Sequence, residues 1–221
     1  MDIKITDLPL KTTPLAGTDL LEVAEDQGGG VFISKKMPGV LIPSGGGGTA
    51  FTYEIGEYVA SEGGIIAYRW LSSSPLGPPT SGTVQNYLVV NLSDVSAAAG
   101  WGFSSGLVGA NSLFDGQSNT SLIAPASAAG TASVLCDSLV SGGKSDWYLP
   151  ATDEWIKIFQ NRWEINQALF TYGTEISLNI YWSSTEISGS NALSFSSITG
   201  TPQSLTKSNT LYVRALRKFS I

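Results

Sequence analysis

The chain has 221 residues, of which 42% are hydrophobic and 14% charged, and its net charge is −6 at pH 7. The acidic balance argues against nucleic acid as a partner, because phosphate-binding surfaces cluster Lys and Arg. No run approaches the roughly 18 apolar residues of a membrane helix, and no apolar signal segment follows Met1. We therefore expect neither membrane insertion nor Sec export.

Residues 1–44 differ in composition from the rest of the chain. Their apolar residues are interrupted by Pro9, Pro14 and Gly17, so the segment cannot build a core of its own. We interpret residues 1–44 as an extended anchor arm that orders on a partner. Residues 45–50 contain four successive glycines and predict a flexible hinge. The main domain should then comprise residues 51–221.

Two β-branched and aromatic runs follow the hinge. Residues 64–70 and 87–92 are bounded by turn residues and predict strands. Pro75, Pro78 and Pro79 stand between them, where fixed φ angles and missing amides disfavour strand pairing. Residues 72–83 should therefore form a long, exposed connection.

The middle of the chain predicts two helices. Within residues 125–140, Val134, Leu135 and Leu139 have helical spacing, and glycines follow as a stop signal. A second helix should begin at Thr152 as its N-cap, since acidic residues follow in the first turn. Trp155 then begins its apolar face.

The end of the chain changes to a period of two. In residues 191–196, Leu193 and Phe195 should face the core, with Ser194 and Ser196 facing solvent. Further strands are expected at 203–206 and 211–217. Two helices beside an antiparallel sheet make an α+β fold.

The residue types argue against catalysis. The chain has no His, which removes the usual general base and the commonest transition-metal ligand. The single Cys136 cannot form an intrachain disulfide, and on a predicted helix it should be a buried, inert thiol. The carboxylates of Asp153 and Glu154 are explained by their place in a first helical turn. We expect no enzymatic activity and no cofactor.

Four stretches occur in the order typical of one family. They are Ile55–Gly56–Glu57 leading to Gly63–Tyr68, Ser145–Pro150 before Asp153–Glu154, Tyr181–Glu186, and Val213–Arg217. With these motifs the chain resembles the C-type-lectin-like domains of phage and bacterial surface proteins, related to the C-terminal domain of collagen-like adhesins. The arm, with Ile5–Pro9 and Leu15–Leu21, resembles N-terminal segments of phage tail-fibre and other virion proteins.

The resemblance implies a two-helix, lectin-like fold and directs attention to calcium-dependent sugar binding. The family's calcium-binding motifs are absent, and Trp182–Ser183–Ser184 stands where Trp-Asn-Asp would supply ligands, so we expect metal-independent recognition. Trp147, Tyr148, Trp182 and Phe195 should pack in the core. Arg214 and Arg217 should form structural ion pairs, with Glu186 or Asp146 as partners.

In related phage domains the last sheet and its loops carry the residues that contact ligands. The corresponding polar side chains here could equally form a solvated strand face, and the sequence leaves both interpretations open. The candidate ligand-binding residues are Ser188, Ser190, Asn191, Ser194, Ser196, Thr199, Gln203, Lys207, Asn209 and Tyr212, with Thr201 on the same face.

Taken together, the resemblance implies a bacteriophage virion structural protein, made in the host cytoplasm and released by lysis. The lectin-like domain would be displayed for recognition of a host-surface glycan or protein, while residues 1–44 would bind other virion proteins and gather a homotrimer. The alternative is a purely architectural head-fibre, decoration or tail protein without a ligand. An exposed aromatic residue beside the polar residues of 185–212 would favour recognition.

Overall fold

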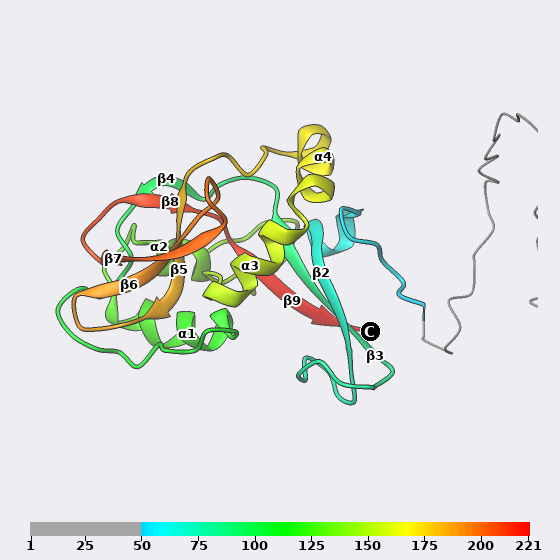
Figure 1. Cartoon of the computed structure of the whole chain (residues 1–221), viewed down its shortest axis with the longest axis horizontal. Coiled ribbons are helices and arrows are strands. Elements are labelled where there is room, and N and C mark those ends of the chain that lie inside the picture. The colour runs from blue at the N-terminus through cyan, green and yellow to red at the C-terminus, as the bar shows by residue number, and fades with distance from the viewer. Residues whose placement is uncertain (1–49) are drawn as a thin grey trace, which may run out of the picture. The chain divides into compact units, whose positions relative to one another are not determined.

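The computed structural model describes residues 50–221, which contain two β-sheets and four α-helices (Figure 1). This mixture of helices and sheets agrees with the predicted α+β class. Residues 50–221 also form one compact unit, close to the predicted domain of residues 51–221. The predicted arm, and the predicted hinge except Ala50, lie outside the described residues.

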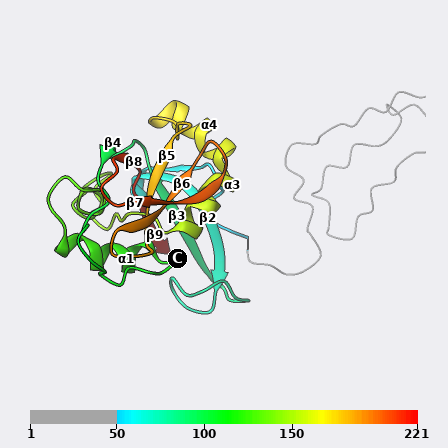
Figure 2. The same cartoon turned by 60° about the vertical axis from the view of Figure 1, so that its left-hand side comes forward.

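The first sheet is antiparallel and has the order β1-β2-β3-β9. Its strands are β1 (Tyr58–Val59), β2 (Gly64–Ser72), β3 (Val84–Asn91) and β9 (Leu216–Ser220). A 3₁₀ turn at Ala60–Glu62 joins β1 to β2. Residues 73–83 form the expected long connection between β2 and β3, which projects from the body of the domain in both views (Figures 1 and 2).

The second sheet has the order β4-β8-β5-β6-β7. Its strands are β4 (Ser96–Ala99), β5 (Ile180–Glu186), β6 (Asn191–Ser196), β7 (Thr201–Thr206) and β8 (Leu211–Val213). The predicted antiparallel pairing holds for β4–β8, β5–β6 and β6–β7, but β5 and β8 run parallel where Tyr181 pairs with Tyr212. The predicted strand at 211–217 is also divided, and its second half joins the first sheet as β9.

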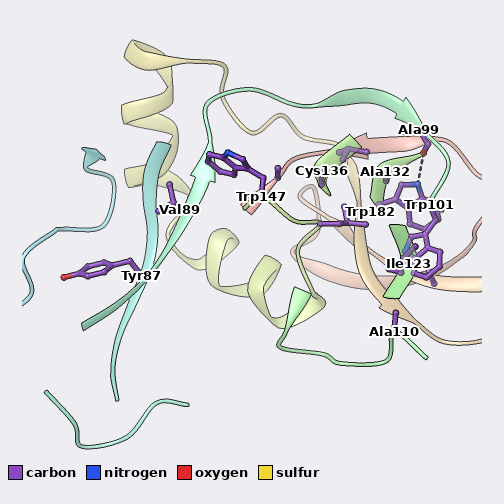
Figure 3. Close-up of a cluster of buried hydrophobic side chains, with 14 of the residues drawn as sticks. Tyr87, Val89, Ala99, Trp101, Ala110, Ile123, Ala132, Cys136, Trp147 and Trp182 are labelled. Carbon is purple, nitrogen blue, oxygen red and sulfur yellow. Dashed lines mark hydrogen bonds between the residues drawn. The ribbon is translucent and has the colours of Figure 1, made fainter. Parts of the chain in front are cut away.

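Strand β3 is buried on both faces. Leu88 and Val90 belong to one apolar cluster, whereas Tyr87 and Val89 belong to another. This arrangement explains why the run reads as continuously apolar rather than alternating. Figure 3 shows how the second cluster extends from Val89 to Trp182.

The predicted core aromatic residues are confirmed. Trp147, Tyr148, Trp182 and Phe195 are all at most 2% exposed. A buried indole N–H needs an acceptor, and Trp182 Nε1 donates to the carbonyl oxygen of Ala99 at 2.8 Å (Figure 3).

The helices are α1 (Gly116–Ile123), α2 (Ala132–Asp137), α3 (Thr152–Gln160) and α4 (Arg162–Tyr172), with a 3₁₀ turn at Ala124–Ala126 after α1. The first predicted helix is confirmed only as the short α2, which ends before Leu139, and buried Cys136 lies on it. Burial raises the pKa of the Cys136 thiol far above its usual value, which keeps it protonated. No helix within residues 50–221 is long and apolar enough to cross a bilayer.

Helix α3 starts as predicted to within one residue. Ala151, not Thr152, occupies the N-cap position, and its backbone N–H donates to Glu154 Oε2 at 2.8 Å. Thr152 is instead the first helical residue, with its hydroxyl 3.1 Å from that of Ser183. The carboxylate of Glu154 thus satisfies a backbone donor at the start of the helix.

Two glycines of separate motifs meet. A Cβ atom added to Gly142 would lie 2.1 Å from Gly63 Cα, and both glycines have positive φ angles, 59° and 76°. The glycine pair after the first predicted helix therefore does more than end it: Gly142 allows the chain to approach the β1–β2 turn.

Candidate functional site

The predicted ligand-binding residues fall into three classes of exposure. Ser190, Thr199, Thr201 and Asn209 are exposed. Ser188, Asn191, Gln203 and Tyr212 are half-buried, whereas Ser194, Ser196 and Lys207 are at most 2% exposed. The prediction that the last three present their side chains to solvent is wrong.

The β6–β7 hairpin brings some of these residues together. Ser194 pairs with Gln203, and Ser196 pairs with Thr201. Tyr212 lies apart from them on β8, two strands from β6 in the sheet order, and its ring contacts Tyr181 at 5.5 Å between centroids. The ten candidates therefore do not form one continuous surface.

Ser194 and Ser196 are buried because β6 is covered on both faces. Ala192, two residues before Ser194, packs in the cluster of Trp182, and Trp182 is the cross-strand partner of Ser194. On the opposite face Phe195 packs against Trp155, with 5.9 Å between ring centroids. Leu193, predicted to be in the core, is only half-buried. The small serines thus fit where large aromatic residues already fill the space.

Lys207 belongs to a buried ion pair rather than to a surface. Its Nζ lies 2.6 Å from Glu186 Oε1, and both side chains are 1% exposed. The same ammonium donates to the carbonyl oxygens of Gly106 and Gly189 at 3.0 and 3.3 Å. The other Glu186 oxygen accepts from the backbone N–H of Gly109 at 2.8 Å. All three ammonium protons are therefore used inside the protein.

The two arginines have structural partners, as predicted. Arg217 binds both carboxylate oxygens of Asp146, at 2.7 and 2.9 Å. Arg214 binds Asp94 at 2.7 Å and the carbonyl oxygens of Asn91 and Thr174. Glu186 is a partner of neither arginine. These contacts tie the closing Val213–Arg217 motif to distant parts of the chain.

Glu154 is likewise occupied by structural contacts. Besides the N-cap contact with Ala151, its carboxylate accepts hydrogen bonds from Tyr148 Oη at 2.9 Å and from the Gly116 N–H at 3.2 Å. Burial raises the pKa of Glu154, and burial together with this carboxylate raises that of the Tyr148 hydroxyl. Within the part of the chain that the structure describes, no group of three or more His, Cys, Asp or Glu side chains is arranged to hold a metal ion.

Two grooves on the described surface contain aromatic side chains. The first, which we call the α4 groove, has a volume of about 910 Å³ and lies between α3, α4, the segment after α4 and the end of β6. Trp163 and Phe170 are 78% and 81% exposed along it, and Phe195 and Ser197 also line it. Exposed aromatic side chains therefore lie beside the end of β6, within the polar region of residues 185–212, but no residue of β7 lines this groove.

The second groove, which we call the β2–α3 groove, has a volume of about 700 Å³. Its lining residues are Tyr68, Trp70, Leu76, Gly77, Pro78, Pro79, Leu88, Phe114, Asp115, Asp153, Glu154, Lys157 and Lys218. None of the sequence motifs predicted this site. Its detectable signal was an alternating Tyr68-Arg69-Trp70 at the end of a predicted strand, followed by a proline-rich connection.

The chain matches no family model, and no curated protein matches it.

Proposed function

We propose that the chain is a structural protein of a bacteriophage virion and that residues 51–221 form a C-type-lectin-like domain for metal-independent recognition of the host surface. The proposal includes no catalytic role. Residues 1–44 would bind other virion proteins. The polar residues that remain accessible in the loops of the last sheet, such as Thr199 and Asn209, would contribute to the contact surface.

The observation that carries this proposal is the pair of aromatic-lined grooves. The resemblance motifs are used inside the domain, since Trp147, Trp182 and Arg217 are buried and bonded there. Large aromatic side chains such as Trp163 nevertheless stand exposed beside concave surfaces. Such side chains are the usual anchors of binding surfaces, and a purely architectural role does not require them.

Particle composition and adsorption test the proposal. An antibody raised against residues 50–221 should label intact particles purified after lysis of the host. The full-length protein, added in excess, should also slow the adsorption of those particles to cells. Labelled particles without competition would favour the architectural alternative, and particles that lack the protein would refute a virion role.

We also propose that the arms assemble the chain as a homotrimer. The apolar residues of the proline-broken arm, such as Ile3, Leu8 and Leu20, cannot be buried within that arm, whereas three arms around one axis could cover them. Linked copies would raise avidity about a hundredfold or more when all can engage. Light scattering should give a trimeric mass for the full chain and a monomeric mass for a chain that starts at Thr49. An oligomer of the shortened chain would refute the role of the arm.

A further inference from the structure

The floor of the β2–α3 groove is created by an irregularity in β2. Ile66 pairs with Val89 and Tyr68 pairs with Leu88, so Ala67 is an extra residue on β2. The extra residue changes which side chains face α3, and it places Tyr68 and Trp70 there. Their rings are nearly parallel, with an interplanar angle of 19° and 6.0 Å between centroids.

The connection between β2 and β3 forms the facing wall and is held in place by buried polar groups. Trp70 Nε1 donates to the carbonyl oxygen of Gly77 at 2.8 Å. The backbone N–H of Leu76 donates to Asn86 Oδ1 at 2.6 Å, and Asn86 Nδ2 donates to Ser72 Oγ at 2.7 Å. Asn86 and Ser72 are fully buried. The indole of Trp70 is thus fixed before any ligand arrives.

Leu76 adds a second sign of a formed site. It has a φ angle of 54°, and among the described residues it is the only non-glycine with a positive φ. Bulky residues rarely adopt this conformation, and such strain concentrates at binding sites and ligand clamps. Leu76 lines the groove and is 45% exposed.

The charged residues of the groove divide into used and free groups. Lys218 Nζ lies 3.0 Å from Asp115 Oδ1 and 3.5 Å from Glu154 Oε1, so these three are paired. By contrast, the Asp153 carboxylate and the Tyr68 hydroxyl have no hydrogen bond or ion pair with any residue from 50 to 221. Lys157 Nζ has no acceptor there either, and it lies 5.1 Å from the centroid of the Tyr68 ring.

We propose that the β2–α3 groove binds a neutral pyranose unit of a cell-surface polysaccharide. The aromatic floor offers flat faces to the C–H face of a sugar ring. Around it, Asp153 accepts hydrogen bonds, Lys157 donates them and Tyr68 does both, which suits hydroxyl groups. This inference rests on the proposed recognition function for the origin of the sugar, and it locates the binding site.

The polar groups favour a sugar over an apolar peptide. An apolar ligand would remove three free polar groups from water without giving them partners. Three carboxylates and two ammonium groups line the groove, so its charge is close to balanced and favours a neutral ligand over an anionic one. The volume of about 700 Å³ is in the usual range for small-ligand sites.

The test uses the full-length protein on an array of immobilised neutral pyranose oligosaccharides, with chelator present. We expect retention on at least one neutral oligosaccharide, and Trp70→Ala should weaken it about tenfold. The control, Tyr172→Ala, removes an exposed aromatic residue that lines neither groove and should leave the affinity unchanged. Asp153→Asn changes an exposed side chain, so it keeps the fold while weakening binding several-fold.

Three results would overturn the inference: no retention of any neutral oligosaccharide, retention of acidic ones alone, or retention that Trp163→Ala, in the α4 groove, abolishes and Trp70→Ala does not. If the protein competes for adsorption but binds no oligosaccharide on the array, sugar binding in the β2–α3 groove is refuted and the proposed function stands. If it binds the array but is missing from particles, the proposed virion role is refuted and sugar binding stands. A thermal melt of each variant checks that lost binding is not lost folding.

Discussion

The β6–β7 hairpin and the β2–α3 groove are both rich in polar side chains, yet they use them in opposite ways. In the hairpin, Ser194 Oγ donates to the Gln203 carbonyl oxygen, and Lys207, the residue after β7, donates its three ammonium protons to acceptors inside the protein. In the groove, Asp153 and Lys157 lie beside aromatic rings, and neither charged group has a hydrogen-bond or ion-pair partner among the described residues. Whether a polar group is available to a ligand thus depends on whether the fold already uses its hydrogen bonds.

The largest expected effect comes from breaking the buried ion pair between Lys207, directly after β7, and Glu186 at the end of β5. Lys207→Met should lower the free energy of unfolding by about 3–5 kcal/mol, because it leaves the Glu186 carboxylate buried without its cation. Denaturant titration of the full-length variant measures this. The control Lys144→Met breaks a partly exposed pair with Glu62 and should cost no more than about 1 kcal/mol. A similar cost for both variants would remove the distinction between internal and surface charge.

The next effect concerns the wall of the groove. Asn86→Ala should cost about 1–3 kcal/mol, because it leaves the Leu76 N–H without its acceptor and removes the hydrogen bond from Asn86 Nδ2 to Ser72 Oγ, which keeps its own bond to the Ser74 carbonyl oxygen. Hydrogen exchange should then accelerate in residues 73–83 more than in β6. Unchanged exchange in 73–83 would mean that Asn86 does not hold the connection.

A smaller effect compares one used and one free polar group. Ser194→Ala removes a buried hydroxyl that donates to a carbonyl oxygen and should cost about 1 kcal/mol. Asp153→Ala removes an exposed carboxylate that has no hydrogen-bond partner in residues 50–221, so it loses only the favourable interaction with the α3 dipole and should cost about 0.5 kcal/mol. Thermal melts of both variants decide the point, and a greater loss from Asp153→Ala would reverse the comparison.

The smallest effect is a pH dependence at an ion pair that is partly open to solvent. Burial alone would raise the pKa of Asp146, but the hydrogen bonds and charge of Arg217 outweigh it and lower that pKa. Asp146 therefore stabilises the fold above the usual Asp pKa and loses this contribution as pH falls through its lowered pKa.

At pH 7, Asp146→Asn should cost up to about 1 kcal/mol, a modest figure because the side chain is 44% exposed. The difference from the wild type should shrink on acidification and vanish when both folded and unfolded states are protonated. Denaturant titrations across the acidic range measure it. If the difference in unfolding free energy between Asp146→Asn and the wild type stayed constant with pH, the lost stability would come from altered geometry rather than from the lost charge.

Much of the fold could be predicted because local signals agreed with packing. The acidic first turn and Trp155 marked α3, and turn residues marked β2 and β3. Helix α4 was not predicted because its own apolar residues lie on more than one face of the helix. Ile165 and Leu169 are buried, whereas Trp163 and Phe170 are exposed. Its helical periodicity is therefore blurred. Helix α1 was missed because its sequence has few apolar residues.

The site was less predictable, for two physical reasons. A period of two indicates which residues share a face of β6 but not whether that face meets solvent, so Ser194 and Ser196 were misplaced. The β2–α3 groove depends on an extra residue, Ala67, and on contacts between Trp70 and a distant loop position. Such contacts form only after the chain has folded.

The most direct test of this account is the reactivity of its lysines. Brief acetylation of the native full-length protein, followed by peptide mass spectrometry, reports which ammonium groups reach solvent. Lys157 should react at a rate close to that of Lys144, while Lys207 should stay unmodified until the protein unfolds, because it is buried and fully hydrogen-bonded. Acetylation of Lys207 as fast as Lys144 in the folded protein, or protection of Lys157 without any ligand, would contradict the account.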